Sequence, residues 1–495
     1  MLKDLLRRGA GLATWPRLAA LALLSATALP MALQRPIDGD EGFFLMASRL
    51  VSKGMALYHD FFFIHGPAIP YLFGAWFRVV GPGWYAARVL AGLISVAIGM
   101  MVFEHLLRAT GRRGWALFGA ALFASTGLVL GWYSPVKSLG ISALFAFGGM
   151  AVLAREGRRS VLIAGVLLGL TTSARLYMLA TVPCALLFLL RRRGWSRALG
   201  RELVQLGIGL AIGALPLIWV LLRDHQAFIF GTVEYHALRD VRSAGVIGDW
   251  SQKRETLLSI LGIESPDGGG AIQFLGLVLL ALGSLFSSAT PRNSPFAPVW
   301  LTLFVVSILP TPSYTQYFCL LVPFLIVEAV VLLASLPTPP LRPVLALGLA
   351  AYAALGVADV RRFLVTGANV PGLWSADRLA RWRIPQVVAV ARAIDEQNLP
   401  VGASWWPGYF VSTRTPIHVD LANDFGMVIA DKVTEPRRRR FHIVTHGEMG
   451  AMIDRHDPPL FVEGNWAYTP NAQLLPARGY QLARTVGPVR IWAVK

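Results

Sequence analysis

Charged residues and cysteines are scarce in this chain of 495 residues. Only 15% of the residues are charged and only two are cysteines, whereas 55% are hydrophobic and the mean hydropathy is +0.54. A water-soluble domain could not bury that much apolar surface, so the excess faces lipid. Cys184 and Cys319 both fall inside apolar runs, which excludes a disulfide framework and a thiolate metal site. We therefore expect a polytopic α-helical membrane protein.

Acidic residues are also few, 28 against 46 Lys and Arg, and the net charge is +18. In a soluble protein this excess would suggest nucleic acid as a partner. Here the arginines stand in short clusters between apolar runs, where they orient a membrane protein. We therefore expect membrane lipid, and no nucleic acid, as a partner.

Apolar runs long enough to cross a hydrocarbon core of ~30 Å predict about eleven transmembrane helices. The candidate spans are 16–34, 84–103, 115–133, 138–154, 161–173, 176–190, 203–222, 271–289, 298–310, 317–336 and 343–359. The first could be mistaken for a signal peptide, but its length and the absence of a small-x-small site favour an uncleaved span. The stretch 161–190 is either one kinked helix or two short helices that meet at Arg175. We favour two, because a charge at mid-membrane depth is costly unless it borders water.

The positive-inside rule orients these spans. Seventeen Lys and Arg, counting Arg17 at the start of the first span with the N-terminal tail, lie in one set of segments, whereas the short loops of the other set carry only Lys137 and Arg175. The basic set comprises the N-terminal tail, 104–114, 155–160, 191–202, 287–297 and 337–343. We therefore expect the N-terminus in the cytoplasm and the chain in a cell inner membrane. Segments 35–83, 223–270 and 360–495 then lie on the periplasmic side.

The outer segment 35–83 is predicted to hold two amphipathic helices at the membrane surface. Phe43, Phe44, Met46, Ala47, Leu50 and Val51 fall on one face of the first helix. The second begins after Gly66-Pro67 and ends at Gly81-Pro82-Gly83. The transmembrane domain as a whole is expected to cover residues 1–359.

Residues 360–495 are predicted to form a small periplasmic α/β domain, large enough to bury its own core. Strands are expected at 401–405, 460–463 and 489–494, and helices at 384–397 and 440–455. The Arg437–Arg440 run is interpreted as a solvated charge cluster, and a contact with phosphate or anionic lipid is the alternative.

An acidic cluster follows the first span directly, at Asp38, Asp40 and Glu41. A carboxylate at the outer mouth of a helix bundle can accept a proton from an incoming hydroxyl. It can equally cap the helix that follows, which is the interpretation we favour for Asp38. For Asp40 and Glu41 the residues alone leave both interpretations open.

The order of features over 36–90 resembles the GT-C class of membrane-embedded glycosyltransferases. It comprises Asp40-Glu41-Gly42-Phe43-Phe44, Lys53-Gly54, Tyr58-His59-Asp60-Phe61, a Gly-Pro turn and an amphipathic helix. The likeness is greatest to the branch with protein O-mannosyltransferases, aminoarabinose transferases and rhizobial lipopolysaccharide-core transferases. The resemblance implies an inverting transferase that takes a sugar from a polyprenyl-phosphate donor to a glycolipid, glycan or protein acceptor in envelope biogenesis.

The resemblance also implies roles for residues. Asp40 would be the general base, with Glu41 beside it as a second catalytic residue. Arginines near the outer helix ends would hold the carrier phosphate, because the guanidinium fork suits a phosphodiester. Arg175 is the stronger candidate. Arg88 is the other, and snorkelling to the interface explains it equally well.

Three further residues are candidate substrate contacts: Asp60, His65 and Tyr317. His65 could equally be a simple turn residue. Related enzymes often carry an Arg-Tyr pair at the Tyr317 position, but no Arg is present here, so Gln316 or Tyr317 would have to replace it.

No cofactor and no metal are expected. Relatives place a carboxylate in the loop where this chain has Lys137, and the few outer carboxylates lack the clustering that hard cations need. A transporter or lipid flippase remains the alternative function, although only one broken helix is found where such folds show paired interruptions. An inactive, lipid-binding scaffold stays open as well.

Overall fold

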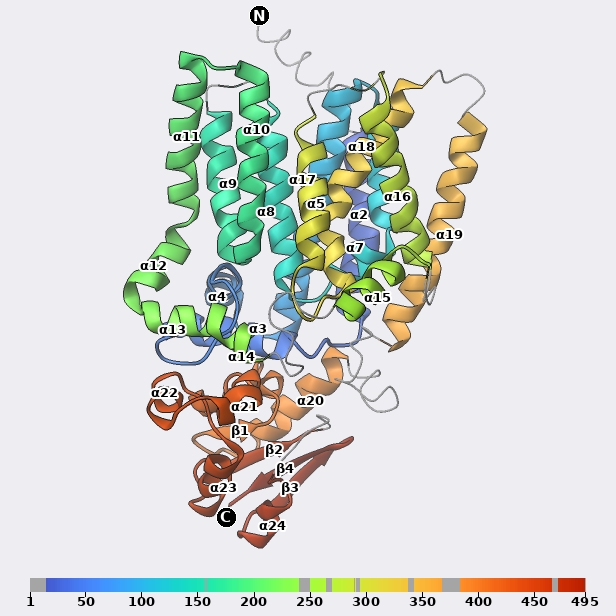
Figure 1. Ribbon diagram of the computed structural model, residues 1–495. Coiled ribbons are helices and arrows are strands. Elements are labelled where there is room, and N and C mark those ends of the chain that lie inside the picture. Colours follow the sequence, from blue (N-terminus) through green and yellow to red (C-terminus); the bar gives the residue numbers. More distant parts are fainter. Residues whose placement is uncertain are drawn as a thin grey trace, which may run out of the picture.

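The computed structural model describes residues 15–155, 157, 159–239, 250–263, 269–288, 290, 294–336, 342–366, 383–464 and 471–494. Long helices stand side by side in one bundle, and the C-terminal part forms an α/β domain at one end of it (Figure 1). The arginine-rich turn between α10 (Thr181–Arg193) and α11 (Arg197–Gly213) lies at the other end. Basic loop and C-terminal domain thus lie at opposite ends, as the charge distribution predicts.

Four described helical stretches are each long and apolar enough to cross a membrane: Trp15–Gln34, Trp84–Thr110, Thr315–Ser335 and Pro343–Val365. A fifth span is possible if α11 and α12 (Leu215–Arg223), which meet at 53°, count as one. Shorter apolar helices complete the bundle. The bundle helices not yet bounded are α2 (Trp15–Gln34), α5 (Trp84–Thr110), α6 (Arg113–Ser125), α7 (Gly127–Trp132), α8 (Ser138–Leu153), α9 (Ser160–Ala174), α16 (Gly269–Phe286), α17 (Phe296–Ile308), α18 (Val322–Ser335) and α19 (Arg342–Thr366). The number eleven stays a prediction.

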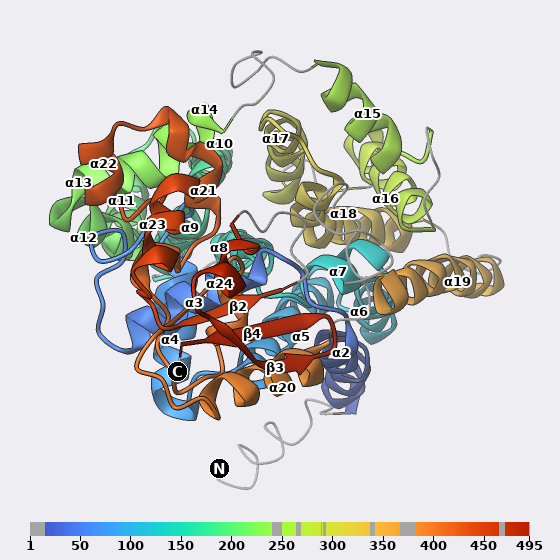
Figure 2. The ribbon, with the colours of Figure 1, turned by 90° about the horizontal axis from the view of Figure 1, so that it is seen from below.

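Helix α19 stands at the edge of the bundle, as both views show (Figures 1 and 2). Only 11% of its most apolar window is buried by protein, so lipid must cover most of its surface. The helix continues to Thr366, seven residues beyond the expected end of the membrane domain at 359.

The break inside 161–190 is confirmed. Helix α9 ends at Ala174, Arg175 has an extended backbone, and a 3₁₀ turn, η1 (Leu176–Ala180), leads into α10. Close packing of α9 on α11 fixes where this break lies, because a Cβ at Gly169 would stand 2.5 Å from the carbonyl oxygen of Leu210. Only a glycine lets the two backbones approach so closely.

Both helices expected in the first outer segment are present, as α3 (Glu41–Ser52) and α4 (Ala68–Val80). Eleven of the twelve residues of α3 are buried, so protein covers this helix; its position at the membrane surface stays a prediction. The C-terminal domain covers it: Arg49 donates to the carbonyl oxygen of Thr413 at 2.7 Å, and Trp406 donates to that of Gly39 at 2.8 Å. Protein, rather than lipid or water, thus surrounds the loop that carries Asp40.

The C-terminal domain contains a four-stranded sheet in the order β1-β2-β4-β3. Strands β1 (Gly402–Ser404) and β2 (Leu460–Glu463) pair in parallel, and β4 (Val489–Ala493) pairs antiparallel with β2 and with β3 (Gln481–Val486). Sequence patterns predicted β1, β2 and β4 but missed β3, which has a largely exposed surface. The domain's helices include α20 (Ile384–Asp395), α21 (Phe425–Ile429), α22 (Glu435–Arg440), α23 (His446–Asp454) and α24 (Leu474–Ala477). The helix expected over 440–455 is present as α23, which begins later, at His446, because α22 ends at Arg440 and a turn follows it.

The Arg437–Arg440 run joins the two domains. Arg437 lies 2.6 Å from Glu234, and Arg440 lies 3.3 Å from Asp224. These acids belong to the segment of α13 (His225–Ile229), the π-turn η2 (Phe230–Glu234) and α14 (Tyr235–Leu238). Arg437 and Arg440 remain 46% and 51% exposed, so the run is solvated as expected. Sequence spacing gave no sign of the acids two hundred positions earlier with which these two arginines pair.

Candidate active site

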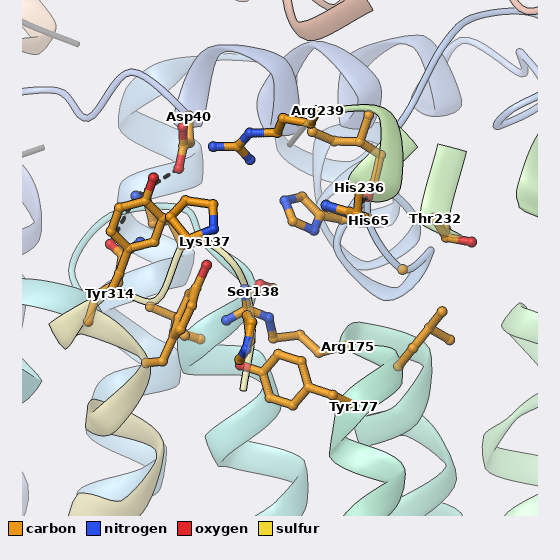
Figure 3. Close-up of a pocket in the computed structure, with 18 of the residues that line it drawn as sticks. Asp40, His65, Lys137, Ser138, Arg175, Tyr177, Thr232, His236, Arg239 and Tyr314 are labelled. Atoms are coloured by element: carbon orange, nitrogen blue, oxygen red, sulfur yellow. Dashed lines mark hydrogen bonds and ion pairs between the residues drawn. The ribbon is translucent and has the colours of Figure 1, made fainter. Parts of the chain in front are cut away.

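A cavity of about 530 Å³ opens at the end of the bundle that faces the C-terminal domain (Figure 3). Six separate stretches of the membrane domain supply its wall, and Phe425 of α21 also lines it. The polar residues that line it are Asp40, His65, Lys137, Ser138, Arg175, Tyr177, Thr232, His236, Arg239, Thr311, Tyr314, Gln316 and Tyr317.

Asp40 enters the cavity at the start of α3 with 27% of its side chain exposed. Its Oδ2 lies 2.9 Å from Nζ of Lys137, whose ammonium group also lies 2.8 Å from Oδ1 of Asp38. Lys137 itself is 4% exposed. Burial opposes its charge, but the attraction of Asp38 and then of Asp40 outweighs burial and raises the pKa of Lys137. Among the described residues, Lys137 thus holds Asp40 at one carboxylate oxygen.

Glu41, the next residue, points the other way and is fully buried. Its two oxygens receive Nε and Nη2 of Arg88 at 2.5 and 2.6 Å, and the backbone N–H groups of Asp38 and Val136 at 2.9 and 2.8 Å. Arg88 donates its remaining bonds to the carbonyl oxygens of Ala32 and Pro36. Neither Glu41 nor Arg88 lines the cavity, and all the polar contacts of this pair are made inside the protein.

Arg175 lies in the wall, between two tyrosine rings. Its guanidinium carbon is 5.0 Å from the centre of Tyr177 and 4.9 Å from that of Tyr317, in cation–π contact. Its Nη1 is buried without a hydrogen-bond partner, and within the described parts of the chain no carboxylate lies at ion-pair distance. A buried cation in this state is ready for an anion that enters from the cavity.

His236 projects from α14, and Arg239 is the residue that follows this helix. Figure 3 shows the guanidinium group of Arg239 directed toward Asp40, and none of the described residues hydrogen-bonds to it. His236 Nε2 lies 3.1 Å from the carbonyl oxygen of Ile64, to which it donates. The cavity thus holds two guanidinium groups, those of Arg175 and Arg239, in addition to Lys137.

His65 lies opposite His236, with ring centres 5.9 Å apart, and stacks on Phe44 at 5.1 Å. Its turn is pressed against the end of α9, since a Cβ at Gly66 would stand 2.3 Å from the carbonyl oxygen of Ser173. Burial, followed by the charge of nearby cations, lowers the pKa of His65 and lowers that of His236 to about 4. Both rings are therefore neutral at pH 7, and they add no positive charge to the cavity.

Of the seven residues proposed from the sequence, the structure brings four together at the cavity: Asp40, His65, Arg175 and Tyr317. The other three, Glu41, Arg88 and Asp60, lie outside it. Asp60 accepts from the backbone N–H of Ala56 at 2.6 Å and pairs with His59 at 2.7 Å, so its carboxylate closes a local turn.

Sequence reasoning did not propose Lys137, Tyr177 and Tyr314 as site residues. A signal existed for Lys137, because it and Arg175 are the only basic residues in the short outer loops, and both line the cavity. No group of three or more His, Cys, Asp or Glu side chains with metal-binding geometry was found among the described residues.

No protein-family model matches the sequence, and a search of curated proteins gives no match. Solved structures do match the fold. ArnT from Cupriavidus metallidurans, an aminoarabinose transferase crystallised with undecaprenyl phosphate, has a TM-score of 0.70 at 13% identity, over 97% of this chain and 98% of ArnT. The apo form of ArnT has a TM-score of 0.68 at 12% identity, over 98% of both chains.

A third structure, the mycobacterial arabinofuranosyltransferase AftD, has a TM-score of 0.52 at 15% identity, over 96% of this chain and 41% of AftD. ArnT and AftD are GT-C glycosyltransferases. This chain therefore has the GT-C fold over almost its whole length, as the resemblance over 36–90 led us to expect.

Proposed function

We propose that this protein is an inverting glycosyltransferase that moves a sugar from a polyprenyl-phosphate donor to an envelope lipid, glycan or protein. One observation carries the proposal. Among the described residues, a carboxylate held at only one oxygen, Asp40, shares a cavity with two guanidinium groups that have no carboxylate at ion-pair distance, those of Arg175 and Arg239. A general base is thereby placed beside an anion-binding site, which is what transfer from a phosphodiester needs.

The chemistry follows from this arrangement. The acceptor hydroxyl attacks the anomeric carbon from the face opposite the phosphate, and its proton passes to Asp40. The bond between the anomeric carbon and the phosphate oxygen breaks, which leaves polyprenyl phosphate and a sugar of inverted configuration. Arg175 and Arg239 stabilise the negative charge that grows on the departing phosphate.

The location of the cavity supports a periplasmic reaction in the inner membrane. The cavity lies at the end of the bundle opposite the arginine-rich turn between α10 and α11. The positive-inside rule assigns that turn to the cytoplasm. The likeness to an ArnT structure that contains undecaprenyl phosphate supports a polyprenyl carrier in particular.

A cellular experiment tests the proposal and names the substrates. Envelope glycolipids, glycans and proteins of a deletion strain are compared by mass spectrometry after complementation with the wild type, Asp40→Asn or Lys53→Ala. Lys53 is an exposed lysine of the same outer segment and serves as the control. We expect one sugar to be lost in the deletion and Asp40→Asn strains and to be restored by the other two proteins. An unchanged envelope in the deletion strain, or full restoration by Asp40→Asn, would contradict the proposal.

A further inference from the structure

Lys137 is the least expected member of the site, because a buried ammonium group stands directly beside the proposed base. Lys137 is the N-cap residue of α8, and its aliphatic chain and charge lie against Trp132, 5.1 Å from the ring centre. Removing such an ion from water is unfavourable unless acids compensate it. Asp38 and Asp40 supply that compensation from the first outer loop.

The ammonium group has three N–H donors, and three acceptors surround it. These are Oδ1 of Asp38 at 2.8 Å, Oδ2 of Asp40 at 2.9 Å and Oε1 of Gln316 at 3.4 Å. No donor remains for a phosphate. Lys137 therefore differs from Arg175, whose Nη1 is unpartnered.

The contacts of Asp40 show what Lys137 does. Lys137 takes Oδ2, and the backbone N–H of Asp40 donates to Oδ1 of Asp38 at 3.1 Å, which ties the two acids together. No described residue donates to Oδ1 of Asp40. The carboxylate is thus fixed in one orientation, with a single oxygen left to face an incoming hydroxyl.

We propose that Lys137 is a positioning residue that acts as a built-in counter-ion, orienting Asp40 and keeping it ionised, while Asp38 retains Lys137 when Asp40 carries the proton. The inference rests on the proposed function and deepens it. In the step itself the proton moves from the acceptor hydroxyl to Oδ1 of Asp40, and Lys137 keeps all three of its protons. Because Lys137 also contacts Asp38, the ammonium group keeps an acid partner while Asp40 carries the proton.

Purified protein in nanodiscs tests this directly. The readout is sugar transfer from the polyprenyl-phosphate donor of the sugar that the envelope comparison finds missing. For Lys137→Ala we expect kcat to fall about 100-fold, while affinity for undecaprenyl phosphate changes less than threefold. Ethylamine, which replaces the missing ammonium group, should raise the kcat of Lys137→Ala at least tenfold. Lys137→Met fills the same space without charge and should not respond to ethylamine. Lys53→Ala should behave as the wild type.

Two further measurements separate positioning from a structural role. Lys137→Arg should keep more activity than Lys137→Met. The acidic limb of the Lys137→Met rate profile should move to higher pH, because a carboxylate without its cation is protonated more readily. If Lys137→Ala fails to fold, these two variants and Asp38→Asn, expected to lower kcat about tenfold, carry the test.

Three outcomes would overturn the inference: wild-type kcat in Lys137→Met, no rescue of folded Lys137→Ala by ethylamine, or a loss of undecaprenyl phosphate binding as large as that of Arg175→Met. The proposed function fails separately, if Asp40→Asn transfers sugar at the wild-type rate. A result in which Asp40→Asn is inactive and Lys137→Met is fully active would refute the role of Lys137 alone.

Discussion

Asp40 and Glu41 are neighbours in sequence, yet each pairs with a cation in a different environment. Glu41 and Arg88 are both 0% exposed, and both carboxylate oxygens are satisfied from inside the protein. Asp40 also pairs with a buried cation, Lys137, but keeps one oxygen toward the cavity. An ion pair with a buried cation thus fixes the loop at Glu41, whereas at Asp40 it leaves a reactive acid exposed to the cavity.

The largest expected effect is a difference in protein stability between variants of these two acids. Glu41→Gln leaves the charge of Arg88 buried without a partner, and removing one member of such a pair typically costs about 3–5 kcal/mol. We expect a large fall in the thermal unfolding temperature in detergent for Glu41→Gln, and little change for Asp40→Asn, which loses transfer activity instead. Equal unfolding temperatures for the two variants would remove the distinction between a structural and a reactive acid.

A smaller effect concerns the neutral histidines on the cavity wall. The folded protein holds the pKa of His236 at about 4 through burial, with Arg239 and Arg175 opposing its charge, whereas an unfolded His titrates near 6.5. Between these values the unfolded chain binds the extra proton, so stability falls as the pH drops from about 6.5 to 4, by up to about 3 kcal/mol. Unfolding measured across this range should give a steeper slope for the wild type than for His236→Asn. Identical slopes would show that the ring is not buried in its neutral form.

Substitution of Arg239 should weaken donor binding more than it lowers the stability of the fold. Arg239→Met removes a guanidinium group that no described residue neutralises, so folding should change little, while the KM for the lipid donor rises about tenfold. Steady-state kinetics at varied donor concentration measure this change. A fall in kcat at constant KM would instead assign Arg239 to the transition state only.

The smallest expected effect lies at the contact between the domains. Charge reversal in Arg437→Glu places like charges together at Glu234, and exposed pairs of this kind contribute about 0.2–1 kcal/mol. We expect a rise in donor KM of a few-fold, because α13 to α14 present His236 and Arg239 to the cavity. The swap Arg437→Glu with Glu234→Arg should restore the KM.

Arg439→Glu is the matched control for that contact, since Arg439 pairs only with Glu435 of its own helix among the described residues. A defect in Arg439→Glu as large as that in Arg437→Glu would mean that the net charge of α22, and not the contact with Glu234, is responsible.

The sequence predicted those features of the fold that depend on residues close together in the chain. The Gly-Pro punctuation gave the limits of α4, and the polar interruption before Arg175 gave the end of α9. The motif around Asp40 gave the GT-C resemblance, which the fold confirms. These features depend on residues a few positions apart, so a single sequence contains enough information to find them.

The rest depends on contacts between distant segments. Arg88 lies 47 positions from Glu41, and nothing in its spacing separates a buried partner from a phosphate ligand or a snorkelling residue. Lys137 meets Asp40 only because the start of α8 packs against the first outer loop. In the same way, the C-terminal domain covers α3 through contacts that the amphipathic pattern of this helix does not predict.

The central claim is that the cavity separates anion binding from proton transfer, with Arg175 serving the first and Asp40 the second. Equilibrium binding of undecaprenyl phosphate to Asp40→Asn and to Arg175→Met in nanodiscs tests this most directly. The account predicts wild-type affinity for Asp40→Asn and affinity at least about tenfold weaker for Arg175→Met, the loss of one charge-assisted phosphate contact. Unchanged binding by Arg175→Met, or equal losses in both variants, would contradict it.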